Sequence, residues 1–115
     1  MPTNDPKKTA TEMLTAWTSG DFARTRALLH DDATFDGPLG QTRGADAYVE
    51  GVRGFAKTID RAEISKTIAD GDDVCVVYNL ITKLGVSIPT VGIYHIESDT
   101  VRSVRVYFDP RPLVQ

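Results

Sequence analysis

The chain has 115 residues, of which 41% are hydrophobic and 25% charged, and its formal net charge is −3. Domains commonly run to about 100–150 residues, so we expect a single domain over residues 1–115, with residues 1–6 frayed. The acidic balance, with no basic run longer than Lys7-Lys8, argues against nucleic-acid binding. No segment approaches the roughly 20 apolar residues of a membrane-spanning helix, which argues against a membrane partner.

The single cysteine and the first residues bear on the cellular compartment. Cys75 cannot form an intramolecular disulfide, and its place in the apolar run 74–77 favours a buried, unreactive thiol. The N-terminal residues lack the apolar stretch of a signal peptide. We therefore expect a cytoplasmic protein.

The spacing of apolar residues predicts three helices in the first half of the chain. The face of the first is formed by Ala10, Met13, Leu14 and Trp17. The face of the third, within residues 44–60, is formed by Tyr48, Val52, Phe55 and Ile59. Between them, Asp21 is a suitable N-cap for a short helix through Leu29. This helix is expected to end at His30, whose imidazolium would interact favourably with the helix dipole.

The rest of the sequence is typical of strands. Alternating or β-branched runs predict strands at residues 33–36, 62–69, 74–82, 86–96 and 103–108. Residues 37–44 are expected to form a loop. Helices followed by hairpin-connected strands indicate the α+β class, and an antiparallel meander is the simplest topology.

Four short strings carry a resemblance to a known family: Trp17–Asp21, Leu28–Phe35, Gly37–Gly40 and Tyr107–Pro112. In order and spacing they resemble the nuclear transport factor 2-like superfamily, especially its SnoaL-like and ketosteroid-isomerase-like branch. The resemblance implies an α+β fold (cystatin-like) in which a cone-shaped, curved antiparallel sheet packs on three helices. It also implies a cone whose mouth admits an apolar small molecule, and pairing of two copies through the outer face of the sheet.

The same resemblance shows which isomerase residues this chain lacks. In ketosteroid isomerases the general base precedes the proline after the first strand, where this sequence has Gly37. The phenol that stabilises the enolate corresponds to Met13, and its partner carboxylic acid to Gly92. An enolising isomerase needs a carboxylate and neutral donors at these places. We therefore exclude that specific activity.

Asp36 and Asn79 are the candidate catalytic residues. Asp36 lies one position before the isomerase base, and because side chains alternate along a strand it is expected to face away from the pocket unless the chain bends at Gly37-Pro38. Asn79 interrupts an apolar strand. It faces inward if Cys75 and Val77 do, and outward if Val76, Tyr78 and Leu80 are inside. The sequence leaves both registers open.

Aromatic and aliphatic residues of the helices and strands are the candidate lining of a pocket: Met13, Trp17, Phe35, Tyr48, Val52, Phe55, Tyr94, Val106 and Phe108. The hydroxyls of Tyr48 and Tyr94 could orient an oxygen-bearing ligand. On the opposite face of the sheet, His95, Arg105 and Tyr107 suit the interface of a homodimer. The two histidines are far apart, with no cysteine or glutamate at ligand spacing, so neither a metal nor a cofactor is expected.

Three functions are compatible with these features. The first is a SnoaL-like isomerase, cyclase or hydrolase acting on an apolar, oxygen-bearing substrate. The second is a non-catalytic module that binds an apolar small molecule. The third is a dimerisation module whose cone is packed shut. Fold alone does not decide between them.

Overall fold

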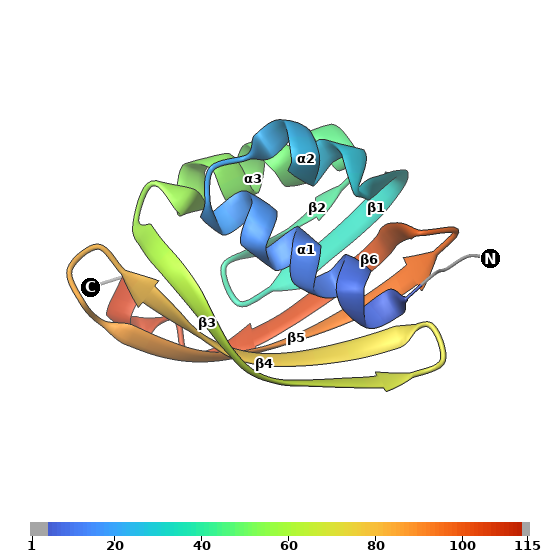
Figure 1. Cartoon of the computed structure of the whole chain (residues 1–115). Coiled ribbons are helices and arrows are strands. Elements are labelled where there is room, and N and C mark those ends of the chain that lie inside the picture. Colours follow the sequence, from blue (N-terminus) through green and yellow to red (C-terminus); the bar gives the residue numbers. More distant parts are fainter. Residues whose placement is uncertain (1–4, 114–115) are drawn as a thin grey trace.

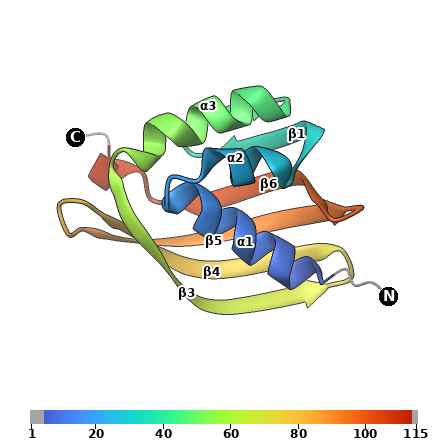
Figure 2. The same ribbon diagram turned by 45° about the horizontal axis from the view of Figure 1, so that its top comes forward.

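The structure, a computed structural model, describes residues 5–113. Its helices are α1 (Pro6–Thr18), α2 (Phe22–Ala27) and α3 (Ala45–Ala56), and a 3-10 turn spans Arg111–Leu113. Its strands are β1 (Leu29–Gly37), β2 (Gly40–Arg43), β3 (Ile59–Asp70), β4 (Asp73–Thr82), β5 (Ser87–Glu97) and β6 (Thr100–Phe108). The three helices lie on one face of a single curved sheet (Figures 1 and 2). This arrangement confirms the predicted α+β class.

The sheet is mixed, which corrects the expectation of a purely antiparallel one. Its strand order is β2-β1-β6-β5-β4-β3. Strands β3 to β6 form the predicted antiparallel meander, but β1 pairs with β6 in parallel, with Phe35 opposite Val104. Strand β2 pairs with one edge of β1, so β6, the last strand of the meander, pairs with the other edge.

Strand β2 lies where a loop was expected. Gly37 pairs with Gly40, so only Pro38 and Leu39 connect β1 to β2. The strand is four residues long and carries no apolar alternation. Its pairing with β1 therefore comes from the tight turn rather than from a hydrophobic pattern.

The second helix is shorter than predicted, and His30 does not cap it. Asp21 is the N-cap, as expected, and its carboxylate accepts a hydrogen bond from the Arg24 backbone N–H at 3.0 Å. The helix ends at Ala27 because the Leu28 carbonyl already accepts from Val101 of β6 at 2.7 Å. His30 lies within β1, where its Nδ1 accepts from the Asp32 backbone N–H at 3.0 Å.

The core lies between the helices and the inner face of the sheet. The predicted stripe of α1 is confirmed, since Ala10, Met13 and Leu14 are fully buried and Trp17 is 5% exposed. Along β4 the buried residues are Val76, Tyr78 and Leu80 with their even-numbered neighbours. The second of the two possible registers is therefore the observed one.

The first helix begins close to the N-terminus. Of residues 1–6, for which fraying is predicted, residues 1–4 lie outside the described part of the chain, Asp5 is the N-cap of α1 and Pro6 is its first residue. Within residues 5–113, no helix is long and apolar enough to cross a bilayer.

Candidate functional site

An apolar groove opens between α3, the β1–β2 hairpin and the end of β6. Its volume is about 390 Å³. The residues that line it are Phe35, Pro38, Leu39, Gly40, Gln41, Thr42, Tyr48, Gly51, Val52, Phe55 and Phe108. We call this space the mouth groove. No acidic or basic side chain is among these lining residues.

A much smaller cavity lies deeper, between the helices and the sheet. Its volume is about 40 Å³, whereas one water occupies about 30 Å³ of liquid. It is lined by Trp17, Phe35, Tyr48, Val52, Phe55, Tyr78, Leu80, Tyr94, Val104, Val106 and Phe108. We call it the deep cavity. Five of the residues that line the deep cavity also line the mouth groove: Phe35, Tyr48, Val52, Phe55 and Phe108.

The structure brings together every residue expected to line a pocket except Met13. Met13 is fully buried in the core and lines neither the mouth groove nor the deep cavity. Tyr78, Leu80 and Val104 were not among the expected lining residues. Tyr78 and Leu80 follow from the alternative register of β4 that the sequence left open, and Val104 from its position on the same face as Val106.

Aromatic contacts fix side chains that line the two spaces. The ring centroids of Trp17 and Phe55 lie 5.7 Å apart, and those of Phe55 and Phe108 lie 6.4 Å apart in a stacked arrangement. Phe35 meets Tyr48 edge to face at 5.5 Å. Because such pairs are worth about 0.5–1.5 kcal/mol beyond their buried area, these side chains are held firmly.

Aromatic rings cover both strand glycines at which the isomerase acids would stand. A β-carbon on Gly92 would lie 2.9 Å from Cε1 of Tyr94, and one on Gly37 would lie 2.9 Å from Cζ of Phe35. In each case the ring belongs to a residue two positions away on the same strand face. The absent carboxylates are therefore replaced by apolar surface.

Three tyrosines, Tyr48, Tyr78 and Tyr94, are among the residues that line the deep cavity. Burial raises the pKa of Tyr48 and of Tyr78 well above the ordinary phenol value, and it raises the pKa of Tyr94 as well. The neighbouring Tyr78 phenol acts against burial and lowers the pKa of Tyr94. At neutral pH all three are neutral phenols that donate hydrogen bonds but do not act as bases.

The mouth groove also borders one polar atom that lacks a partner. Within residues 5–113, the Thr42 hydroxyl is the buried side-chain oxygen with no hydrogen bond. Thr42 lies on β2 opposite Phe35, and its methyl group faces Gly51 of α3. Leaving a buried hydroxyl unpaired costs about 1–3 kcal/mol.

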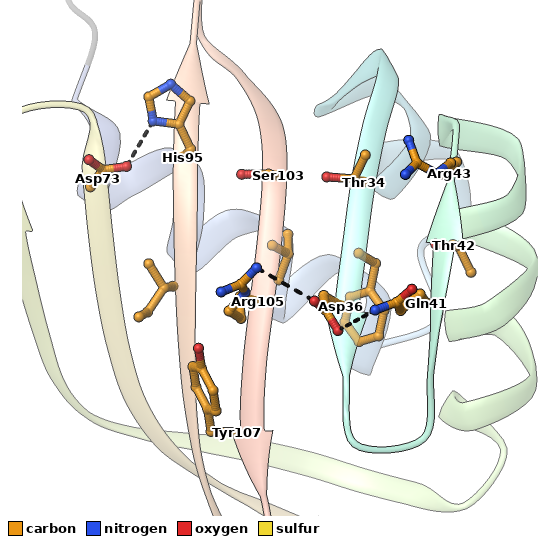
Figure 3. A pocket seen from close by; sticks show the side chains of 13 residues that line it. Thr34, Asp36, Gln41, Thr42, Arg43, Asp73, His95, Ser103, Arg105 and Tyr107 are labelled. Atoms are coloured by element: carbon orange, nitrogen blue, oxygen red, sulfur yellow. Dashed lines mark hydrogen bonds and ion pairs between the residues drawn. The ribbon is translucent and has the colours of Figure 1, made fainter.

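Asp36 lies on the outer face of the sheet, as the alternation of side chains predicts. Figure 3 shows it between Gln41 and Arg105. The Gln41 amide donates to one of its oxygens at 3.2 Å, and Arg105 lies 3.5 Å from the other. On the same face, His95 Nδ1 lies 2.8 Å from Asp73. These residues border a shallow hollow of about 440 Å³ on the side away from the helices.

Asn79 and Cys75 share that outer face of β4. Both are half-buried, and both lie in the outward-facing phase of the strand. The structure therefore brings neither Asp36 nor Asn79 to the mouth groove or the deep cavity. The Cys75 thiol is not fully buried, which corrects the expectation from its apolar neighbours. No group of three or more His, Cys, Asp or Glu side chains among the described residues could hold a metal ion.

Comparison with known proteins identifies the family. The sequence model of the SnoaL-like domain matches residues 10–104. A nuclear transport factor 2-like protein of unknown function from Cytophaga hutchinsonii is 28% identical, with a TM-score of 0.85 over 99% of this chain and 98% of that one. None of the functionally curated proteins matches the sequence.

Two solved structures with named activities share the fold. An LEH-like epoxide hydrolase from M. tuberculosis is 22% identical, with a TM-score of 0.80 over 92% of this chain and 84% of that one. A putative ketosteroid isomerase from Kribbella flavida is 16% identical, with a TM-score of 0.81 over 96% and 87%. At these identities the likeness concerns the fold alone.

Proposed function

Since this chain belongs to the SnoaL-like domain family, within the nuclear transport factor 2-like superfamily, we propose that it binds a neutral, apolar small molecule in the mouth groove. The observation that carries the proposal is the groove's size and lining. The groove is lined mostly by apolar side chains, and its volume is about 390 Å³. This volume lies near the lower end of the range of about 300–1,000 Å³ that is common for ligand pockets. The Thr42 hydroxyl lacks a partner but is shielded from solvent, so a ligand oxygen accepts a hydrogen bond from it only if the Thr42 side chain turns toward the groove.

The placement of the charged residues supports binding rather than proton transfer. General acid–base catalysis works best with a group whose pKa is near the working pH. Asp36 faces the other side of the sheet, and the buried phenols have raised pKa values. The alternative is an isomerase, cyclase or hydrolase on an apolar, oxygen-bearing substrate, which the named activities of the two structural neighbours favour. Mass spectrometry of a bound ligand after incubation distinguishes the two, because a converted product contradicts simple binding.

Filling the mouth groove is expected to weaken binding. Gly51 lies on α3 and lines the groove, and a β-carbon there would meet only the Thr42 methyl group, at 3.9 Å. A leucine side chain at this position therefore fits the helix but occupies the ligand's space. We expect Gly51→Leu to weaken binding by at least about tenfold, which is about 1.4 kcal/mol. The measurement is a titration with 2-decalone, a neutral two-ring ketone, read by the fluorescence of Trp17, the chain's single tryptophan.

The control variant is Gly54→Leu in the same helix. Gly54 is exposed, a β-carbon there meets nothing within 4 Å, and the residue does not line the groove. Both substitutions remove a helical glycine, so both are expected to raise helix stability by up to about 1 kcal/mol. Unchanged decalone affinity in Gly51→Leu would place the ligand elsewhere.

We also propose that two copies pair through the outer face of the sheet. Ile93 is 40% exposed there and Tyr107 51%. Arg105 lies among Asp36, Asp73 and these apolar groups (Figure 3). A two-fold axis brings the same patch of each copy together, so a face that carries both charge signs can complement itself.

A charge placed on this face is expected to separate the copies. Ile93→Asp adds a carboxylate that must be desolvated in the interface, and we expect dimer dissociation to rise by at least about tenfold. Sedimentation equilibrium measures it. Leu84→Asp, at the 93%-exposed tip of the β4–β5 turn, is the matched control. A wild-type chain that sediments as a monomer would contradict the pairing.

Cytoplasmic location stays a prediction from the sequence.

A further inference from the structure

We infer that Gly92 and Tyr94 together set the depth of the site, so that the protein accepts a neutral molecule of one or two rings and excludes a longer one. This inference rests on the proposed binding in the mouth groove and adds the class of ligand. It depends on which space inside the cone the Tyr94 ring occupies.

Tyr94 occupies the place that a side chain at position 92 would take. Both residues lie on the inner face of β5. A β-carbon on Gly92 would lie 2.9 Å from Cε1, 3.3 Å from the hydroxyl oxygen and 3.4 Å from Cζ of Tyr94. The ring thus lies along its own strand and over Gly92, and only glycine leaves room for it there.

The ring is directed toward the mouth. Gly92 pairs with Val106 on β6, and Thr90 pairs with Phe108, which lines the mouth groove. A ring that extends from position 94 over position 92 therefore lies between the buried end of the cone and the groove. Tyr94 is 1% exposed and lines the deep cavity but not the groove.

The free volumes of the two spaces differ in the way that a ring bounding the deep cavity, away from the groove, requires. The mouth groove has about 390 Å³, whereas the deep cavity has about 40 Å³. The smaller space holds about one water of 30 Å³ and no ring. A ligand that enters the cone must therefore stay in the groove unless Tyr94 moves.

The packing around the Tyr94 ring resists that movement. Tyr94 is 1% exposed, and the neighbouring Tyr78 is buried as well, so turning the ring away would push it into packed side chains. On the neighbouring wall, Phe35 covers Gly37 in the same manner, with Cζ 2.9 Å from the place of a β-carbon, and packs edge to face on Tyr48. The deep cavity beside the Tyr94 ring, of about 40 Å³, is too small to accept the displaced ring.

Two ketones of different length test the inference. The first is 2-decalone, with two saturated rings, and the second is 5α-androstan-3-one, which carries the same kind of carbonyl on four saturated rings. Each is titrated against wild-type protein and Tyr94→Leu, with Trp17 fluorescence as the readout. Leucine has no counterpart of Cε1, Cζ or the hydroxyl of Tyr94, so the space over Gly92 opens. Tyr94→Ala serves as a second variant, and circular dichroism establishes that each variant is folded.

We expect wild-type protein to bind the four-ring ketone at least about tenfold more weakly than decalone, and Tyr94→Leu to remove most of that difference. Decalone affinity should change less than about threefold, because its place in the groove is unaltered. Equal wild-type affinity for both ketones overturns the inference and leaves the proposed function standing, as does discrimination that persists in both folded variants. If neither ketone binds to any variant, the proposed function fails and the inference fails with it.

Discussion

Leu80→Ala is expected to lower the free energy of unfolding by about 2–5 kcal/mol, the range for deletion of a buried leucine side chain. Leu80 is 1% exposed on the inner face of β4, and it forms part of the wall of the deep cavity. Removing its side chain adds a void beside a space that already exists, so the neighbours cannot close it easily. Urea unfolding followed by circular dichroism measures the loss. For a domain of ordinary stability, about 5–15 kcal/mol, the loss is a large fraction of the total.

Ile81→Ala on the next residue is the matched control. Ile81 is half-buried on the outer face of the same strand. It loses a comparable aliphatic group from a partly solvated place, so we expect a cost of about 1 kcal/mol. A larger loss for Ile81 than for Leu80 would mean that the outer face, and not the inner one, carries the core of this strand.

The periodic elements of this fold can be predicted from the sequence. The α1 stripe that ends in Trp17 has the spacing of one helical face, and β6 places Val104 and Val106 on one face with Arg105 on the other. In both, local spacing and burial agree, which is the condition under which sequence patterns determine structure. The register of β4 lacks that agreement, because residues 74–81 are apolar on both faces apart from Asn79.

Strand β2 and the parallel pairing of β1 depend on long-range contacts. Gln41 and Thr42 show no apolar alternation, and their pairing with Asp36 and Phe35 follows from the turn at Pro38-Leu39. The end of α2 likewise depends on Val101, which is far along the chain. No local pattern carries this information.

The candidate site, too, can be predicted from the sequence only in part. Stripes of apolar residues predict the walls, including Phe55 and Phe108, because each stripe faces the interior of the cone. The pleat predicts the outward direction of Asp36. The free volume depends on where the Tyr94 ring lies, and a side-chain rotamer cannot be read from residue spacing.

Gly92→Val is expected to lower the free energy of unfolding by about 1–3 kcal/mol, the usual cost of overpacking a core. Valine suits a strand better than glycine does, so the backbone alone would favour the change. Any loss must therefore come from the side chain, whose β-carbon would lie 2.9 Å from Cε1 of Tyr94. Because that ring is buried and the deep cavity beside it has only about 40 Å³, it has little space into which to retreat. The measurement is the urea midpoint at constant slope.

A double-mutant cycle isolates the contact between the two side chains. In a Tyr94→Leu background the clashing atoms are absent, so Gly92→Val should cost nothing or stabilise the strand by up to about 1 kcal/mol. The coupling energy between positions 92 and 94 is then at least about 1 kcal/mol, above the 0.3–0.5 kcal/mol scatter of independent sites. Equal costs in the two backgrounds would mean that Gly92 is required by some other neighbour. The cycle needs no ligand, so it tests the position of the Tyr94 ring even if no ketone binds.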